Sequence, residues 1–380
     1  IDKQDTEYGA AGRWTDSDFV RFRYGLPEKI GGWIKLIQNT LVGVARDMHA
    51  WTDLNGVRYT AIGTDRKLYI YTEGVAYDIT PVRATGSITG FETFSSTSVT
   101  VTDPSHGADV GDFVTISSTS GAVNGIPAAT MDAEYQILTV PDANTYTITT
   151  AAAATSTGTS SETATATYQI SVGTAVSQYG YGWGTWQWGK EAWGTARSTS
   201  NVTIDGRNWS FDNFGEDLLA TVNNGNTFRW DTSVGTGTPA AVISNAPTVS
   251  RFNLVSMPDR HVFLFGTETT IGNSNTQDDL FLRFASQEDY NTWSPTATNT
   301  AGSFRVQDGS KIITAVRSRN AVLVWTDTSL NALQFVGAPF TFNLTQIGAN
   351  CGAVSLHSAV DVNGTAFWMS QNSFYKFDGA

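Results

Sequence analysis

The sequence contains little of what metal binding, disulfide bonding or membrane insertion requires. Its single cysteine, Cys351, excludes a disulfide framework and a cysteine-based zinc site. Its four histidines, His49, His106, His261 and His357, are isolated and lack the spacing of metal ligands. No apolar run approaches the roughly 20 residues that a helix needs to cross a bilayer. We therefore expect no metal site, no cofactor and no membrane span.

Charged residues are also scarce, at 15% of 380 residues, and their balance is acidic. Asp and Glu number 35 against 23 Lys and Arg, which gives a net charge of −12. This balance excludes a general nucleic-acid binder, because such a protein needs a basic face to displace counterions. The length exceeds what one core usually organises, so we expect two or more units. Because the chain opens on Ile1 and stops just after an apolar run, we expect it to belong to a longer polypeptide.

Helical periodicity is nearly absent, and only residues 16–23 are predicted to form a helical turn. Thr and Ser are plentiful, aromatic residues reach 12%, and apolar and polar residues alternate over short runs. Such alternation is typical of half-buried strands, where β-branched and aromatic side chains pack well. The sequence therefore predicts an all-β protein.

Five pairs of alternating runs predict β-hairpins. They are residues 57–63 with 68–71, 218–222 with 227–230, 261–265 with 280–284, 321–325 with 330–335, and 365–369 with 373–377. Two of the four intervals between them are close to the ~40–45 residues of one propeller blade. Further strands are expected at 42–51, 312–317 and 354–359. We therefore predict a β-propeller with blades of three or four antiparallel strands, and an irregular β-sandwich is the alternative.

The long first interval requires an insertion, and the composition changes where it falls. Between residues 84 and 168 the chain is rich in Ser, Thr, Ala and Gly and contains no Trp. Alternating runs at 98–102, 112–116, 135–140 and 145–148 predict a small β-barrel or sandwich domain, and residues 151–165 are predicted to be a mobile return linker. The propeller would then consist of residues 1–83 and 169–380.

An aromatic-glycine segment, residues 178–195, follows the insertion. Four of the twelve tryptophans lie close together in it. Rings at this density must be buried in the chain or against a neighbour. A loop folded over the propeller, a sugar-stacking platform and a subunit contact are the three interpretations. We select the subunit contact, because large rigid aromatic side chains are favoured at interfaces. Its candidate residues are Tyr181, Trp183, Trp186, Trp188 and Trp193.

No sequence motif identifies a reaction, so we expect no enzyme. The carboxylates of Asp278, Asp279, Glu288 and Asp289 offer a candidate acid and base for glycoside hydrolysis. They lie in polar, turn-like sequence, where solvated acids are far commoner than catalytic ones. A host-surface propeller that binds or cleaves glycans is therefore kept as the alternative function.

Four phrases resemble the tail nozzle proteins of short-tailed bacteriophages. They are RFRYGLPEKIGGW at 21–33, NWSFDNFGEDLLA at 208–220, ASQEDYNTW at 285–293 and VNGTAFWM at 362–369. The resemblance extends over almost the whole chain outside the insertion, and the insertion is similar to a small β module found in such phage proteins.

The resemblance implies a structural protein of the virion, located in the phage tail. Six copies would form a homo-hexameric tube below the portal and its adaptor, the head-to-tail connector, with tail fibres or spikes attached outside. Double-stranded DNA would pass through the tube during ejection without specific binding. The acidic composition suits such a conduit, because an acidic wall repels phosphates. The resemblance also implies that a C-terminal portion beyond this chain includes strands that close the propeller or build the distal tip.

Overall fold

The structure is a computed structural model that describes residues 18–32, 34–37, 39–179, 203–257, 259–337 and 340–379. It divides into two compact units, residues 1–40 and 41–380. All five candidate interface residues of the aromatic-glycine segment lie outside the described residues. Among the residues described, no helix combines the length and the apolar character that crossing a bilayer demands.

The first unit contains a β-hairpin of β1, Val20–Arg23, and β2, Leu26–Lys29. The turn between them needs positive φ, which Gly25 adopts at 79°. The predicted helical turn at 16–23 is therefore wrong for its last four residues. Val20 and Phe22 alternate with two arginines, and a period of two followed by a turn favours a strand.

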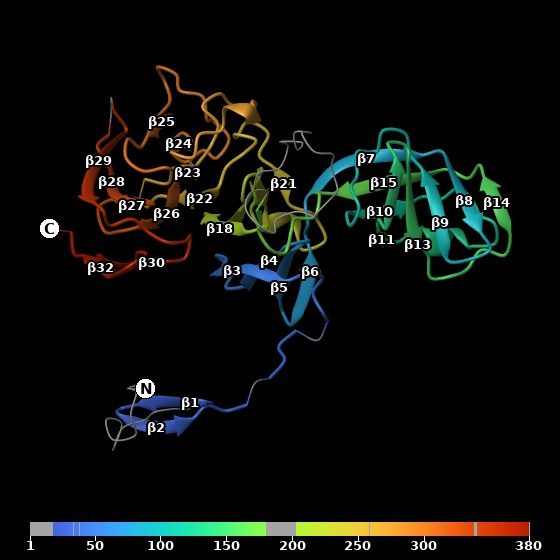
Figure 1. Ribbon diagram of the computed structural model, residues 1–380, viewed down its shortest axis with the longest axis horizontal. Helices are drawn as coiled ribbons and strands as arrows, with labels where there is room; N and C mark the ends of the chain where they lie inside the picture. The colour runs from blue at the N-terminus through green and yellow to red at the C-terminus, as the bar shows by residue number, and fades with distance from the viewer. Residues whose placement is uncertain are drawn as a thin grey trace, which may run out of the picture. The chain divides into compact units, whose positions relative to one another are not determined.

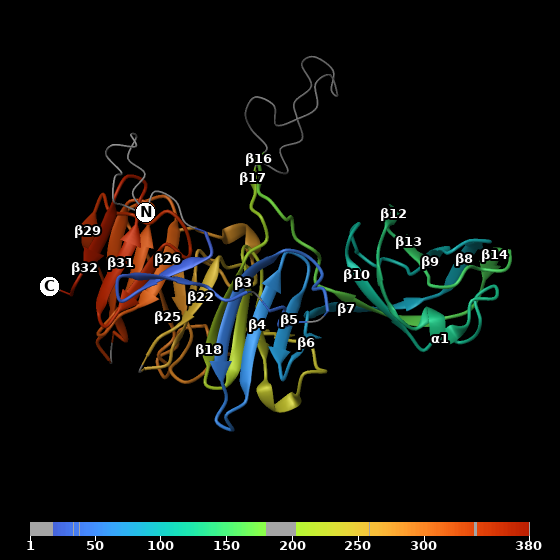
Figure 2. The same ribbon diagram turned by 90° about the horizontal axis from the view of Figure 1, so that it is seen from below.

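In its described residues, the second unit contains five antiparallel sheets of three or four strands that follow chain order, and we call them blades 1 to 5. Blade 1 consists of β3 Ala45–Thr52, β4 Arg58–Thr64, β5 Leu68–Thr72 and β6 Val75–Asp78. Blade 2 consists of β18 Trp209–Phe214, β19 Asp217–Val222, β20 Thr227–Trp230 and β21 Ala241–Val242. Figure 2 shows β3, β4, β5 and β6 side by side in one sheet.

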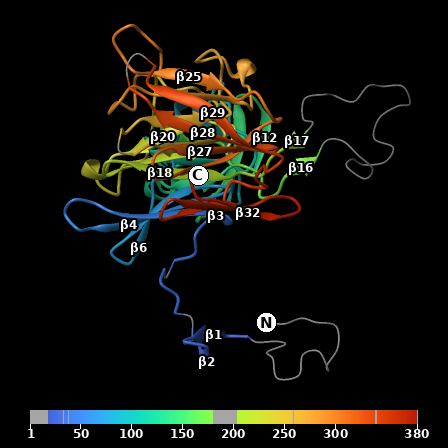
Figure 3. The same ribbon diagram turned by 90° about the vertical axis from the view of Figure 1, so that its left-hand side faces the viewer.

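The other three blades repeat this arrangement. Blade 3 consists of β22 Phe252–Val255, β23 Val262–Phe265, β24 Phe281–Phe284 and β25 Gly302–Arg305. Blade 4 consists of β26 Ile312–Arg317, β27 Val322–Thr326, β28 Ser329–Phe335 and β29 Phe342–Ala349. Blade 5 consists of β30 Ala359–Val362, β31 Thr365–Met369 and β32 Phe374–Phe377. In Figure 3 strands β27, β28 and β29 lie next to one another.

The first strands of the blades lie against one another around a common axis. Strand β18 contacts β3 and β22, and β26 contacts β22 and β30. Apolar side chains fill the spaces between the sheets, such as Ile70 with Trp209 between blades 1 and 2, and Trp325 with Trp368 between blades 4 and 5. Inner strands that share one axis with packed blade faces are the arrangement of a β-propeller. The predicted all-β fold with a propeller body is confirmed.

The five predicted hairpins are confirmed as β4–β5, β19–β20, β23–β24, β27–β28 and β31–β32. At the Asn-Gly turn of β19–β20, Asn224 has the expected positive φ, 55°. The strand predicted at 354–359 is wrong, because β30 begins only at Ala359. The Ser358 amide and hydroxyl both donate to the Ser355 carbonyl oxygen, so this segment forms a turn instead.

The inserted strands form two sheets that share one core. One sheet has the order β11-β10-β15-β7 and the other β12-β13-β9-β8-β14, and both contribute buried side chains to it, including Val101, Ile116, Tyr146 and Tyr168. In Figure 1 the ribbon of these strands is drawn in cyan and green. Their bounds are β7 Val82–Ile88, β8 Gly90–Phe94, β9 Ser98–Thr102, β10 Phe113–Ser117, α1 Ala128–Met131, β11 Glu134–Gln136, β12 Thr139–Asp142, β13 Thr145–Thr149, β14 Thr157–Ser160 and β15 Ala164–Gln169.

The predicted mobile linker at 151–165 is wrong, because this segment belongs to the inserted fold. Strand β14 pairs with β8, Ala154 is buried, and Ala164 opens β15. The low-complexity composition hides a strand pattern, since Ala164, Ala166 and Tyr168 point inward while Thr165 is exposed. Small alanine side chains let the sheets approach closely where larger ones would not fit.

Candidate functional site

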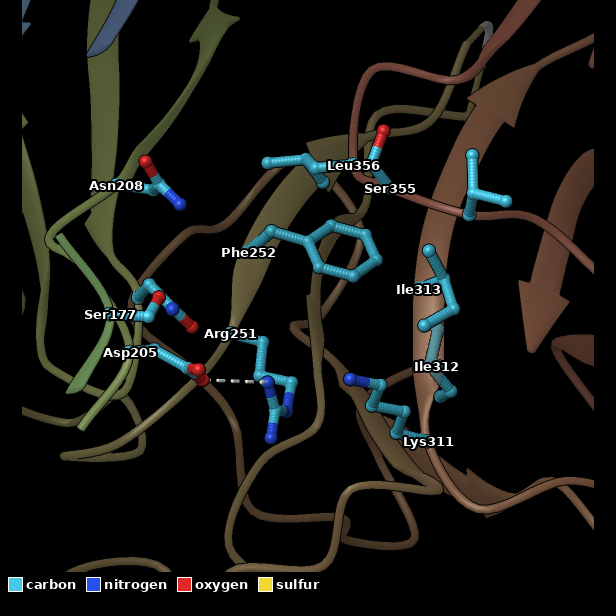
Figure 4. Close-up of a pocket in the computed structure, with 12 residues that line it drawn as sticks. Ser177, Asp205, Asn208, Arg251, Phe252, Lys311, Ile312, Ile313, Ser355 and Leu356 are labelled. Atoms are coloured by element: carbon cyan, nitrogen blue, oxygen red, sulfur yellow. Dashed lines mark ion pairs between the residues drawn. The ribbon is translucent and has the colours of Figure 1, made fainter. Parts of the chain in front are cut away.

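The main candidate site is a polar pocket of about 210 Å³ at the end of the propeller where the inner strands begin. We call it the axial-end pocket. Arg251 and Lys311 directly precede β22 and β26, Asn208 precedes β18, and Leu356 belongs to the connection before β30. Figure 4 shows Asn208 and Asp205 on one wall, with Ile312 and Lys311 on the opposite wall. The propeller thus brings together residues that are far apart in the sequence.

Arg251, which lines this pocket, is already paired with a carboxylate. Its Nε and Nη2 donate to the two carboxylate oxygens of Asp279 at 2.8 and 2.9 Å, and its Nη1 lies 3.6 Å from Asp205. Burial opposes the charge of Arg251, but the hydrogen bonds to Asp279 outweigh it and raise the pKa of the guanidinium. This fork-to-carboxylate pairing fixes the side chain, so it organises the pocket wall rather than leaving a free cation.

Several other polar side chains of the pocket have no hydrogen-bond or ion-pair partner among the described residues. Among the described residues, no side-chain hydrogen bond or ion pair engages Lys311, Asn208 or Asn223, all of which line the pocket. An ammonium group and two amides can donate and accept hydrogen bonds from a hydroxyl-rich or weakly anionic ligand. The volume is below the usual range of drug-sized sites, so the pocket fits one small ring or one end group.

The four carboxylates proposed as an acid and a base are not brought together. Asp278 and Asp279 precede β24, whereas Glu288 and Asp289 follow it, so the two pairs lie at opposite ends of that strand. Asp289 accepts hydrogen bonds from the Asn291 amide and the Thr292 hydroxyl at 2.7 and 2.6 Å, which closes a local turn. A glycosidase needs its two carboxyl groups about 5–9.5 Å apart across one bond.

The lowered pKa of Asp278 does not suit a general acid in glycoside hydrolysis. Burial alone would raise the pKa of its carboxyl, but the Leu280 amide and the Arg305 guanidinium lower it overall. Arg305 Nε donates to Asp278 at 2.6 Å. A general acid needs a raised pKa, so the arrangement holds Asp278 as a structural anion.

Polar contacts join the inner strands of successive blades. Arg317, at the end of β26, donates to Asp212 of β18 at 2.9 Å and to the Val255 carbonyl oxygen of β22. Near blades 1 and 5, His357 Nε2 lies 3.7 Å from Asp47. The Val255 amide also donates to Asp212, at 2.7 Å, so this cluster links the inner strands of blades 2, 3 and 4 at the end of β22.

One face of blade 5 is apolar and exposed. Strand pairing places Val360, Val362, Phe367, Met369 and Phe374 on the same side of the sheet, and they are 42–82% exposed. We call this set the open face. The opposite side packs on blade 4. An exposed apolar patch of this kind marks an interaction surface more often than an ordinary surface.

The aromatic-glycine segment joins the propeller beside the axial-end pocket. Strands β16, Gln178–Tyr179, and β17, Thr203–Ile204, pair at its base. Ser177 and Asp205, next to these strands, both line the pocket. The five aromatic candidates themselves lie outside the described residues, so their role in a subunit contact stays a prediction.

Sequence reasoning missed the pocket residues Asn208, Arg251 and Lys311. A basic residue directly before an apolar strand was the available signal for Arg251 and Lys311. Within the described part of the chain, no three His, Cys, Asp or Glu side chains converge where they could hold a metal ion.

Comparison with known proteins does not identify a family for this chain. No family model and no curated protein matches the chain. Among solved structures, the chain is similar to phage phi92 endosialidase with 13% sequence identity and a TM-score of 0.28. The alignment covers 86% of this chain and 51% of that chain, so the chain spans about half the length of the endosialidase. The propeller assignment rests on the strand pairing described above, and this distant likeness adds nothing to it.

Proposed function

We propose that this chain is a structural subunit of a phage tail nozzle, without enzymatic activity, in which several copies enclose a channel for DNA. The observation that carries the proposal is the open face of blade 5. Five apolar side chains on one sheet face are costly to leave in water, and a neighbouring copy that covers them would be stabilised by their burial. The four phrases that resemble nozzle proteins support the same role.

The channel would lie between copies. Arg317, Asp212 and Val255 link the inner strands of blades 2, 3 and 4 closely, so we expect DNA to pass between copies rather than along the axis of one propeller. The net charge of −12 supports a wall that repels phosphates and lets DNA slide. In the virion, the ring would sit in the tail below the adaptor as a homo-hexamer, with fibres or spikes outside.

Assembly of the purified protein tests this proposal. We expect sedimentation and negative-stain images to reveal a ring, and Phe367→Ala with Phe374→Ser to shift it toward monomer. Leu54→Ser, which changes an exposed apolar residue between β3 and β4, is the matched control and should leave the ring intact. A monomer at every concentration, or a ring whose inner surface is mainly basic, would contradict the nozzle.

The second candidate function is a glycan-binding propeller. The side chains of Lys311, Asn208 and Asn223 favour it, because they can form hydrogen bonds with a ligand in the axial-end pocket. Under that reading, Lys311→Met and Asn208→Ala should abolish retention on bacterial envelope glycans while the fold is kept. A glycan-cleaving enzyme would also lose sugar release with Asp279→Asn, Glu288→Gln or Asp289→Asn. The nozzle proposal expects these three carboxylate variants to affect assembly or nothing.

A further inference from the structure

A second cavity, of about 280 Å³, lies where the inserted domain joins blade 2, and we call it the root cavity. Val82 and Arg83 come from the start of β7, Ile170 from the segment that returns from the insertion, and Phe228 and Val242 from blade 2. Arg207 completes it from the segment before β18. The cavity belongs neither to the axial-end pocket nor to the open face, and its ligand does not depend on the proposed function.

Arg207 is an unusual group in this cavity, because it is a largely buried guanidinium without an ion-pair partner. Its Nη2 donates to the Ser171 carbonyl oxygen at 2.7 Å, whereas its buried Nη1 has no hydrogen-bond partner among the described residues. Burial lowers the pKa of Arg207, and the more distant carboxylates of Asp112 and Asp65 only partly oppose this. Buried charges are normally paired, and an unpaired one is costly.

The position of Arg207 is fixed by its surroundings. Its backbone amide donates to the Thr174 carbonyl oxygen at 2.9 Å. Gly173 packs directly against its side chain, since a Cβ at that position would lie 2.3 Å from Arg207 Cβ. The guanidinium is therefore held in place before any ligand arrives, which reduces the entropy lost on binding.

Arg83 adds a second guanidinium to the same cavity. Its Nη1 donates to the Gly107 carbonyl oxygen at 2.7 Å, and its Nη2 lies 3.8 Å from the fully buried Asp112. That distance is too long for a hydrogen bond. Arg207 is held by a neutral carbonyl oxygen, whereas Arg83 is held by a carbonyl oxygen and a long ion pair with Asp112. The N–H groups that remain can bind an anion.

Most of the remaining lining is apolar, and Ser171 and Asn226 are its other polar residues. Val222 and Phe228 are buried at its floor, and the half-exposed Val242 lies at its rim. A free phosphate would gain nothing from such walls. A carboxylate attached to an aliphatic or aromatic group matches both parts, because the anion meets the guanidinium groups and the apolar portion is removed from water.

We propose that the root cavity is a binding site for a carboxylate joined to an apolar group, either a small organic acid or the C-terminus of a peptide with an apolar last residue. Arg207 and Arg83 hold the carboxylate, and Val222, Phe228 and Val242 hold the apolar portion. The ligand contacts both the inserted domain and blade 2, so its binding also restrains the junction between them.

Calorimetric titration of the whole chain tests the proposal with three matched probes. Hexanoate carries both features, hexanamide lacks the charge, and acetate lacks the apolar portion. We expect hexanoate to bind at least about tenfold more tightly than either of the others. Equal binding of hexanoate and hexanamide would overturn the site, as would equal binding of hexanoate and acetate.

Variants locate the binding in the cavity. Arg207→Gln should weaken hexanoate binding by at least about tenfold, whereas Arg58→Gln, an exposed arginine on β4, should not change it. If Arg207→Gln fails to fold, Arg83→Gln and Val242→Glu serve instead. Val242→Glu places a negative charge at the rim that repels the probe, so this variant should weaken binding while the chain stays folded. Unchanged affinity in the folded variants rejects the site.

The two sources of carboxylate are separated by a short peptide that ends in leucine. Binding tighter than hexanoate, lost when the terminus is amidated, assigns the site to a peptide C-terminus. Binding weaker than hexanoate assigns it to a small organic acid. Binding that is unaffected by amidation would contradict recognition of a carboxylate.

Discussion

At the scale of single residues, buried charges hold parts of the chain together. Lys67 is 2% exposed, and its Nζ lies 2.6 Å from carboxylate oxygens of Asp78 in blade 1 and Glu134 in the inserted domain. It also lies 4.4 Å from the centroid of the Phe113 ring. One ammonium group thus joins blade 1 to the inserted domain.

Lys67→Met should destabilise the protein by about 2–4 kcal/mol, because two carboxylates would lose their shared partner. The value falls toward the lower end since both acids remain partly exposed. Urea unfolding measures it, and Lys376→Met, an exposed lysine, is the control with a change under about 0.5 kcal/mol. If the two variants were equally stable, the ion pairs of Lys67 would not hold the domains.

The same group predicts an alkaline limit. Burial opposes the charge of Lys67, but Asp78 and Glu134 raise its pKa above the ordinary value of 10.5. A raised pKa in the folded state means that the stabilisation is fully present below pH 10.5 and is lost as the pH rises through the folded pKa. Melting temperatures recorded between pH 9 and 12 should fall more steeply in the parent than in Lys67→Met.

An acidic limit follows from Asp278. Its pKa is lowered below 3.8, so its stabilisation is present above that pH and is lost as the pH falls through the folded pKa. Arg305→Gln should move the Asp278 titration, followed by NMR, back toward 3.8. The accompanying loss of stability should be only about 0.2–1 kcal/mol, because Arg305 is half exposed. A titration that does not move would assign the lowered pKa to the Leu280 amide alone.

At the scale of elements, alternation along each strand determines which face of a blade packs. On β31, Ala366 and Trp368 are buried against blade 4, whereas Phe367 and Met369 are exposed on the open face. Trp368 also donates its indole N–H to the Cys351 carbonyl oxygen at 2.7 Å. Neighbouring residues of one strand therefore have separable roles.

Trp368→Ala should cost about 3–5 kcal/mol and release blade 5 from blade 4, because a large buried ring and its hydrogen bond are lost. Hydrogen exchange of the amides in β30, β31 and β32 would report this. Phe367→Ala is the matched neighbour: it should leave exchange in the monomer unchanged and weaken assembly only. Equal loss of protection in both variants would mean that the open face is part of the fold itself.

Local pattern predicted most of these elements, but not all of them. The hairpins made by the second and third strands of each blade are apolar or alternating runs on either side of a turn, so they were predictable. The outer strands β6, β21, β25 and β29 and the first strands β18, β22 and β30 were missed. Strand β21 has only two residues, and all four residues of β22 are buried, so neither presents an alternating surface.

At the scale of the whole molecule, the acidic aromatic-rich chain is expected to act through assembly. Trp186→Ser with Trp188→Ser should weaken ring formation more than folding of the monomer, because interface energy concentrates in a few large aromatic residues. Comparing sedimentation with thermal melting separates the two effects. Trp51→Ser, a partly buried tryptophan on β3, should instead lower the melting temperature. Unchanged assembly in the double variant would favour a packing lid over a subunit contact.

The sequence by itself determined the strand content and the local hairpins, because side-chain period and turn chemistry act between residues that are close along the chain. The tertiary structure alone decided which side chains meet. Arg317 and Asp212 are 105 positions apart, and Arg251, Lys311 and Asn208 share a pocket only because the inner strands wrap around one axis. Such convergence depends on the stacking order of whole sheets, and no local pattern records that order.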